Sequence, residues 1–260
     1  MPEIARHDPG NFCWIELGTI DAKAAKAFYG GLFGWTFQDD PTGPDSFYTT
    51  TKLGGKEVGG LYEYDAAQKK RGVPPHWLTY VAVASADDAA AKAKELGATV
   101  TMAPFDVMDL GRMALLQDPQ GAAFAIWQAK KHFGSRIKNE TGTYGWNELA
   151  TTDDAAARDF YTKLFGWSAK LESGGGMNYT EWQHGGTSIG GCMKLDPAWG
   201  PVPPHWLVYF MVDDCDAGTA KAASLGGSVR VPPMTIEKVG RFAVLADPSG
   251  AVFAIIRLMT

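Results

Sequence analysis

Two hydrophobic periodicities alternate along the chain. Residues 12–18 alternate as a short strand, and helix-spaced apolar positions follow in AKAAKAFYGGLF, with Asp21 placed as N-cap and Gly34 as the stop. The same reasoning predicts strands at 47–53, 58–64 and 76–83, a capped helix at 86–97, and strands at 112–117 and 122–128 around the turn DPQG. Each half of the chain therefore contains two βαβββ-like units.

The two halves of the chain repeat the same sequence motifs. FCWIELGTIDAKAAKAFYGGLFGWTF (12–37) matches YGWNELATTDDAAARDFYTKLFGWSA (144–169), so that Trp14 recurs as Trp146, 132 positions later. VPPHWL at 73–78 returns at 202–207, and GRMALLQDPQG matches GRFAVLADPSG, both at a shift of 129. A period this long indicates a duplicated domain rather than a solenoid. We expect a first domain at 8–130, a linker at 131–142 and a second domain at 143–260.

The motif order resembles a known family. A strand that ends before an acidic helix cap, a helix of the form AAxxFYxxLFGW and a closing strand introduced by DPxGAxFAI are similar to the vicinal oxygen chelate superfamily. That superfamily contains glyoxalase I, bleomycin-resistance proteins, extradiol dioxygenases and related epimerases. The resemblance covers nearly the whole chain. It implies an α+β fold of two tandem domains, each built from paired βαβββ modules whose curved sheet forms a cup with the helices outside.

The resemblance also implies where a metal would bind. Metal-using members carry ligands on the first strand of each module and seven residues after the Asp of the closing DPxG turn. In this sequence the matching positions hold side chains that cannot ligate zinc, iron or manganese, namely Trp14, Trp146, Leu78, Leu207, Ala125 and Ala254. We therefore expect no metal and no other cofactor. A divalent metal bound through a shifted register, with Glu16 and His76 or Glu148 and His205 as ligands, is the alternative.

Alternation along the strands predicts the cup lining, because residues two apart face the same side. It places one Glu and one His in each cup, as candidate acid/base groups: Glu16 and His76, and Glu148 and His205. The alternative for VPPHWL is structural, with the His bonded to a nearby carbonyl or carboxylate. Candidate ligand-binding residues are Trp14, Tyr80, Trp127 and Arg112 in the first copy and Trp146, Tyr209 and Arg241 in the second.

A carboxylate among apolar side chains is costly to bury without a partner, so each Glu must be paired, protonated or exposed at the cup mouth. Pairing with the His or Tyr of the neighbouring strand, or with Arg112 and Arg241, would give each Glu a structural role in stabilising the cup. A free Glu would be a base or an acceptor for a ligand.

Composition narrows the function further. The 260 residues carry a net charge of −5 without a Lys/Arg cluster, which weighs against nucleic-acid binding. The three cysteines show no CxxC spacing, no apolar run is long enough to span a bilayer, and MPEIARHDPG lacks the apolar core of a secretion signal. We expect a cytoplasmic protein, monomeric or homodimeric, that contacts neither nucleic acid nor membrane.

These observations predict a small-molecule-binding protein of the glyoxalase/bleomycin-resistance type without the usual metal ligands. Its ligand would be apolar or aromatic with a hydrogen-bonding group. One alternative is an enzyme, a glyoxalase-like lyase or a dioxygenase- or hydroxylase-like enzyme that uses the Glu and His of the cups. Another is a non-catalytic interaction or stress-response module whose cups are filled by their own side chains.

Overall fold

A computed structural model describes residues 3–44, 46–174 and 177–259. The first half contains β1 (Phe12–Thr19), α1 (Ala22–Phe33), β2 (Thr36–Gly43), β3 (Ser46–Leu53), β4 (Lys56–Glu63), α2 (Ala66–Lys70), β5 (His76–Ala82), α3 (Ala86–Glu95), β6 (Thr99–Val107), β7 (Gly111–Gln117) and β8 (Ala123–Ala129). The second half contains β9 (Tyr144–Thr151), α4 (Asp154–Phe165), β10 (Ser168–Gly174), β11 (Met177–His184), β12 (Thr187–Lys194), the short 3₁₀ helix η1 (Pro197–Trp199), β13 (His205–Met211), α5 (Cys215–Ser224), β14 (Ser228–Ile236), β15 (Gly240–Ala246) and β16 (Val252–Leu258).

Each half forms one eight-stranded sheet. The strand order is β2-β3-β4-β1-β5-β8-β7-β6 in the first sheet and β10-β11-β12-β9-β13-β16-β15-β14 in the second. Within each sheet the first strands of the two modules pair antiparallel, β1 with β5 and β9 with β13. The predicted α+β fold of two tandem domains, each with paired βαβββ modules, is confirmed.

The four long helices start and stop where the sequence indicates. The side chains of Asp21 and Asp153 accept hydrogen bonds from the backbone N–H groups of Ala24 and Ala156 and so cap α1 and α4. Both helices end at a glycine with positive φ, 75° at Gly34 and 72° at Gly166, a conformation that costs glycine nothing. Among the described residues, no helix has the length and apolar character required to span a membrane.

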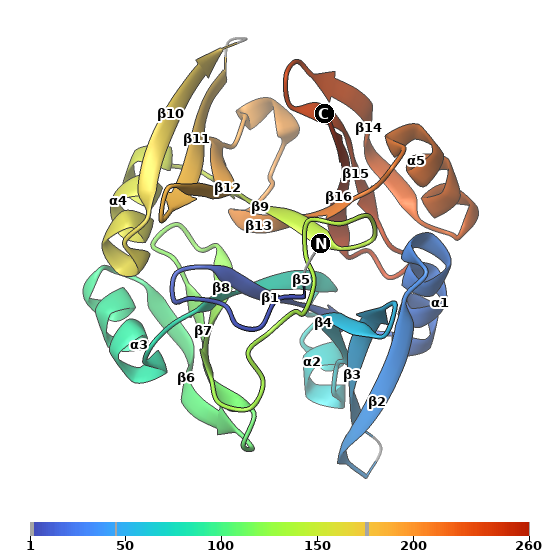
Figure 1. The fold of residues 1–260 in the computed structure, drawn as a ribbon, viewed down its shortest axis with the longest axis horizontal. Helices are drawn as coiled ribbons and strands as arrows, with labels where there is room; N and C mark the ends of the chain where they lie inside the picture. Colours follow the sequence, from blue (N-terminus) through green and yellow to red (C-terminus); the bar gives the residue numbers. More distant parts are fainter. Residues whose placement is uncertain (1–2, 45, 175–176, 260) are drawn as a thin grey trace.

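The backs of the two sheets share one hydrophobic core. Figure 1 shows the central strands of both sheets stacked at the middle of the molecule, with α3 and α4 at one side and α1 and α5 at the other. Four aromatic side chains donate hydrogen bonds across this junction: Tyr29 to Asp247, Tyr161 to Asp118, Trp35 to the carbonyl of Gly142 and Trp167 to that of Gly10. The helices thus lie outside each cup, as expected, and each of the four long helices contacts a helix of the other copy, α1 with α5 and α3 with α4.

The three residues that the second copy lacks come from two connections. Strand pairing relates Thr36 to Ser168, 132 positions apart, but Lys52 to Gln183, 131 apart, so one residue is missing in the β2–β3 hairpin. The other two residues are missing from the β12–β13 connection. This connection forms the short helix η1, whereas the equivalent β4–β5 connection of copy one forms the longer helix α2. Apart from β10, which is one residue shorter than β2, the equivalent strands have the same lengths, and the two cups are therefore directly comparable.

Candidate functional site

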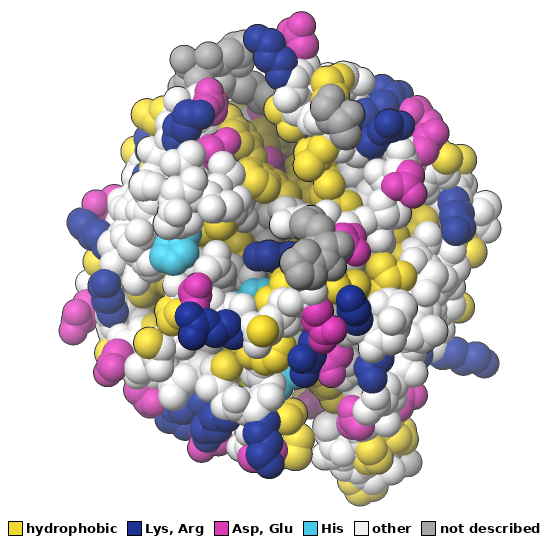
Figure 2. Space-filling model, viewed as in Figure 1, with side chains coloured by type: hydrophobic (Ala, Val, Ile, Leu, Met, Phe, Trp, Pro, Cys, Tyr) yellow, Lys and Arg dark blue, Asp and Glu magenta, His cyan; other side chains and the backbone are white. Residues whose placement is uncertain are grey.

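The inner face of each sheet carries the side chains that alternation assigned to it. We call cup one the face of the first sheet that carries Trp14, Glu16, Leu78, Tyr80 and Trp127, and cup two the face of the second sheet that carries Trp146, Glu148, Leu207, Tyr209 and Ile256. Trp77 and Trp206 point to the opposite side, into the shared core. Figure 2 shows a hollow between β10–β12 and β14–β16, with hydrophobic side chains along its walls. Cup two opens there.

Each cup has a carboxylate held by tyrosine hydroxyls at its floor. In cup two, Tyr209 donates to Oε1 of Glu148 at 2.7 Å and Tyr179 donates to Oε2 at 2.9 Å. The Trp146 indole N–H donates in turn to the Tyr179 oxygen at 3.0 Å. Each carboxylate oxygen can accept two hydrogen bonds, so the tyrosines leave one acceptor position open on each oxygen.

Cup one repeats this arrangement. Tyr80 donates to Oε1 of Glu16 at 2.9 Å, the Tyr48 hydroxyl also donates to Glu16, and the Trp14 indole donates to the Tyr48 oxygen at 2.9 Å. Among the alternatives that the sequence leaves open for Glu16, the structure has the pairing with the Tyr of the neighbouring strand. The sequence misses Tyr48, and in cup two it misses Tyr179.

Burial shapes the protonation of both sites. Desolvation raises the pKa of Glu16 and of Glu148 above the usual carboxyl range, and the tyrosine hydrogen bonds counteract part of this effect. Burial, together with the nearby carboxylate, also raises the pKa of Tyr80 and Tyr209 well above 10. The tyrosine hydroxyls therefore stay protonated, and they serve as donors to the carboxylates.

The raised pKa of Glu148 gives a pH-dependent contribution to stability. A carboxyl whose pKa is higher in the folded state stabilises the fold fully below its unfolded pKa of 4.5, and this stability is lost as the pH rises through the folded pKa. Glu148→Gln removes the titration. We expect the melting temperature of the variant, relative to the wild type, to rise between pH 5 and pH 8. A difference that is flat across this range would contradict the burial of Glu148 as a charged group.

Glycines in the neighbouring strand make room for the missed tyrosines. A Cβ atom on Gly60 would lie 2.0 Å from the Tyr48 hydroxyl, and one on Gly191 would lie 1.8 Å from that of Tyr179. The tyrosine rings therefore lie across the glycines to reach the carboxylates. The signal was present in the sequence, because Tyr48 and Gly60 recur as Tyr179 and Gly191 at one common shift of 131.

Gly191→Ala should displace Tyr179 from Glu148. Overpacking of this kind costs about 1–3 kcal/mol, and we expect a loss of this size in the free energy of unfolding, measured by urea denaturation. In a Tyr179→Ala background the same Gly191→Ala change should cost much less, because the clashing ring is gone. Equal costs in the two backgrounds would show that the glycine serves another purpose.

The two histidines are held at the start of the cup strands. Nδ1 of His76 lies 3.0 Å from the carbonyl of Pro74 and 2.9 Å from the hydroxyl of Tyr64. Nδ1 of His205 lies 2.9 Å from the carbonyl of Pro203. Among the described residues, no hydrogen bond joins either His to the Glu of its cup. This geometry matches the structural alternative for VPPHWL, in which the His is bonded to a nearby carbonyl.

The two arginines lie away from the cups. Arg112 forms a two-pronged ion pair with Asp87 at the start of α3, at 2.7 and 2.8 Å, and Arg241 forms the same pair with Asp216 at the start of α5. The reason is strand alternation. Met113 and Leu115 face cup one, and Arg112, which directly precedes Met113 in the strand, therefore points to the opposite side, where the helices lie. Glu16 and Glu148 are consequently paired with tyrosines and not with these arginines.

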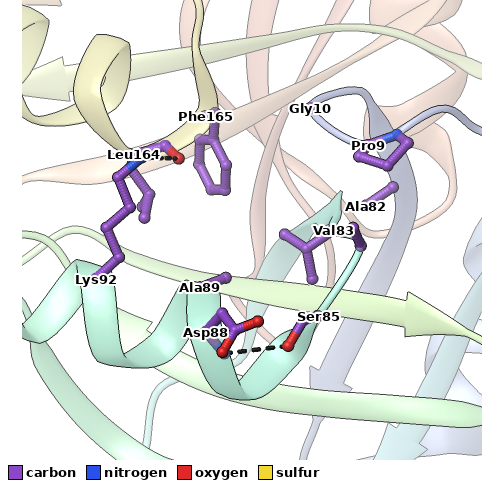
Figure 3. Close-up of a pocket in the computed structure, with 11 residues that line it drawn as sticks. Pro9, Gly10, Ala82, Val83, Ser85, Asp88, Ala89, Lys92, Leu164 and Phe165 are labelled. Carbon is purple, nitrogen blue, oxygen red and sulfur yellow. Dashed lines mark hydrogen bonds between the residues drawn. The ribbon is translucent and has the colours of Figure 1, made fainter.

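Two further pockets lie at the junctions between the copies, outside the cups. One has a volume of about 270 Å³ and is lined by β5, α3 and the end of α4. Figure 3 shows that its lysine, Lys92, points to the carbonyl of Leu164, to which it donates at 3.5 Å, and that Ser85 caps the backbone N–H of Asp88. Its polar groups thus serve the helix ends, and the cups remain the better candidate site.

Comparison with known proteins shows the family of the chain. The sequence model of the Glyoxalase/Bleomycin resistance protein/Dioxygenase superfamily matches residues 12–126 and again residues 131–255. The chain belongs to this superfamily. The superfamily resemblance expected from the sequence motifs is thereby confirmed.

Relatives within the superfamily match over nearly their full lengths. A Mycobacterium bovis protein named "Putative glyoxylase CFP32" is 42% identical over 259 residues, 99% of this chain and 98% of the relative. The anthracycline biosynthesis protein DnrV of Streptomyces peucetius is 37% identical over 265 residues, 98% of this chain and 96% of the relative. The Mn(II)-bound glyoxalase of Novosphingobium aromaticivorans has a TM-score of 0.66 at 17% identity, covers 98% of this chain and 83% of its own, and shares the fold.

Aliphatic side chains occupy positions in cup one where the superfamily resemblance implies metal ligands. Leu78 pairs with Glu16 and Ala125 pairs with Tyr80, so aliphatic side chains stand beside the carboxylate where further ligands would be needed. Within the described part of the chain, no three His, Cys, Asp or Glu side chains come together as a potential metal site. A single carboxylate with two tyrosine partners is a poor donor set for zinc, iron or manganese.

Proposed function

We propose that this protein binds a planar, apolar small molecule that carries a hydrogen-bond donor, and that it does so without a metal. The observation that carries the proposal is the Glu148 carboxylate at the floor of an apolar cup, with each oxygen bound by one tyrosine hydroxyl. The remaining lone pairs accept hydrogen bonds. A hydroxyl or amino group on the ligand would therefore complete the floor.

The walls support an aromatic ligand. Trp146, Phe242 and Met211 pack around Leu207 and Tyr209 in cup two. Flat rings and a polarisable thioether favour contacts with another ring. One relative is named for the biosynthesis of anthracyclines, which are fused-ring aromatic compounds that bear hydroxyl groups, and this name fits the same ligand class.

A matched pair of probes tests the proposal. 2-Naphthol and 2-methoxynaphthalene share a ring system, but only the first has a donor. We expect 2-naphthol to quench tryptophan fluorescence with at least tenfold higher affinity, because a hydrogen bond to a charged group contributes about 1.5–3 kcal/mol. Dialysis against EDTA or addition of Mn²⁺ should leave this affinity unchanged. Equal affinities for the two probes, or a requirement for metal, would contradict the proposal.

A second candidate function, metal-free acid–base catalysis, is favoured by the raised pKa of Glu148. A carboxylate whose pKa is raised by burial is a more basic proton acceptor. Its open lone pairs would face a substrate bound against Trp146. Exchange of an α-proton of an aryl ketone for solvent deuterium, followed by NMR and lost in Glu148→Gln, would support catalysis over binding alone.

A further inference from the structure

The segment that joins the two copies is anchored on cup one. After β8 the chain turns back, and the backbone N–H groups of Lys130 and His132 both donate to the carbonyl of Leu110. Further along, the N–H of Ser135 donates to the carbonyl of Cys13 and the N–H of Arg136 to that of Glu57. The segment 130–136 therefore crosses from the β6–β7 turn to β1 and β4, over one end of the cup.

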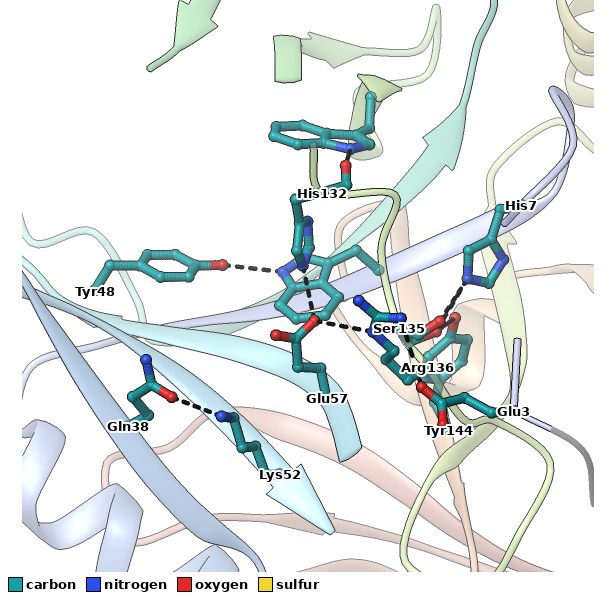
Figure 4. Close-up of polar contacts among 12 residues, drawn as sticks. Glu3, His7, Gln38, Tyr48, Lys52, Glu57, His132, Ser135, Arg136 and Tyr144 are labelled. Carbon is teal, nitrogen blue, oxygen red and sulfur yellow. Dashed lines mark hydrogen bonds and ion pairs between the residues drawn. The ribbon is translucent and has the colours of Figure 1, made fainter. Parts of the chain in front are cut away.

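His132 holds this segment against the cup wall. Its ring packs edge-on against Trp14, with 4.8 Å between ring centroids, and against Trp127 at 6.0 Å. The Trp127 indole donates to the His132 carbonyl at 2.8 Å, and Nε2 of His132 lies 3.4 Å from Oε2 of Glu57. Figure 4 shows His132 and Arg136 both beside Glu57, and both contact the same carboxylate oxygen, Oε2. A hydrogen bond from His132 lowers the pKa of Glu57.

The second copy lacks the residues that anchor such a cover. Strand pairing places Ser188 at the position of Glu57, because it lies opposite Gln183 as Glu57 lies opposite Lys52. In the same way Ile256, which has no N–H donor in its side chain, takes the position of Trp127. Neither the acidic anchor nor the indole anchor is present in cup two.

Exposure of the cup rims follows this difference. In cup one, Leu110 and Val107 are packed against the hydrophobic cluster of the cup, and Trp14 is only 5% exposed. The equivalent rim residues of cup two, Val239 and Ile236, are 44% and 38% exposed. Trp146, the equivalent of Trp14, is partly exposed. The covered rim and the open rim lie at equivalent places in the two sheets, between β6 and β7 and between β14 and β15.

We infer that the two cups are functionally different: cup two is the ligand site, and in cup one segment 130–136 covers Trp14 with the ring of His132 and so blocks the aromatic wall. In cup one an aromatic side chain of the protein itself contacts the tryptophan that, in cup two, is left for an aromatic ligand. The ligand class in this inference rests on the proposed function. The difference in access between the cups does not.

Binding stoichiometry tests the assignment of the site. Calorimetry with 2-naphthol should give one site per wild-type chain, which Glu148→Gln weakens at least tenfold and the matched Glu16→Gln leaves unchanged. The variant His132→Ala/Glu57→Ser, which removes the covering ring and gives cup one the serine that cup two has at the position of Glu57, should gain a second site. Two equal sites in the wild type, or a loss in Glu16→Gln similar to that in Glu148→Gln, would overturn the inference.

A second measurement needs no ligand. With 5-fluorotryptophan incorporated, the ¹⁹F resonances of Trp14 and Trp146 are assigned from Trp→Phe variants, and a soluble nitroxide reports their accessibility. We expect broadening of the Trp146 signal alone in the wild type. Broadening of both signals would overturn the inference, whether or not 2-naphthol binds. If 2-naphthol does not bind but only Trp146 is broadened, the proposed ligand class fails and the difference between the cups stands.

Discussion

Asp118→Ala should lower the free energy of unfolding by about 2–4 kcal/mol, because it leaves buried donors without an acceptor. Asp118 is 3% exposed and accepts hydrogen bonds from the backbone N–H groups of Gln120 and Ala122 and from the hydroxyl of Tyr161. That hydroxyl accepts from the Trp206 indole at 3.0 Å. The substitution therefore removes the acceptor for a turn of copy one and for the Tyr161 hydroxyl, which copy two places in the shared core.

Urea denaturation with a double-mutant cycle measures this effect. Tyr161→Phe alone removes one link, and the pair Asp118→Ala/Tyr161→Phe should cost less than the sum of the two single changes. Asp87→Ala is a surface control, because its ion pair with Arg112 is exposed and such pairs contribute little. Additive costs for Asp118 and Tyr161 would show that the link between the copies carries no energy of its own.

Glu148→Gln should weaken the binding of 2-naphthol about 10–100-fold at pH 7 and leave the fold intact. The amide removes the negative charge and presents an NH₂ group to one of the two tyrosine donors, so the floor loses charge-assisted hydrogen bonds of about 1.5–3 kcal/mol. Fluorescence quenching measures the affinity. The binding of 2-methoxynaphthalene should change little, because it has no donor to lose.

The matched variant Tyr209→Phe removes one donor and retains the charge. We expect it to reduce affinity less than Glu148→Gln, because Tyr179 still positions the carboxylate. An unfolded Glu148→Gln variant, recognised by its melting curve, would make Glu148 a structural residue and contradict its role in the ligand site.

The sequence predicts most of the fold and part of the site. The repeated motifs identify both copies, and strand alternation alone places Trp14, Glu16 and Tyr80 on one face, because period two is a local property of a strand. Tyr48 and Tyr179 depend on how β3 and β11 lie across their neighbours, which a single strand does not encode. Alternation also applies to Arg112, and there it indicates the helix side once the register of β7 is known.

His132 shows a different limit of sequence reasoning. It lies in the predicted linker, where periodicity lapses and the usual signals of function are missing. Its importance comes from contacts with residues far away in the chain, Trp14 and Glu57. It also comes from copy two, where serine and isoleucine stand at the positions of Glu57 and Trp127.

The crossed hydrogen bonds between the copies have a consequence for how the duplicated gene could diverge. The aspartate in the closing turn of each copy is satisfied by a tyrosine from the helix of the other, so each half supplies what the other half lacks. A half expressed by itself would leave these partners and an aromatic face uncovered. Natural selection would therefore constrain the residues of the shared core in both copies together. The cups face away from each other, and their residues could change independently and acquire separate roles.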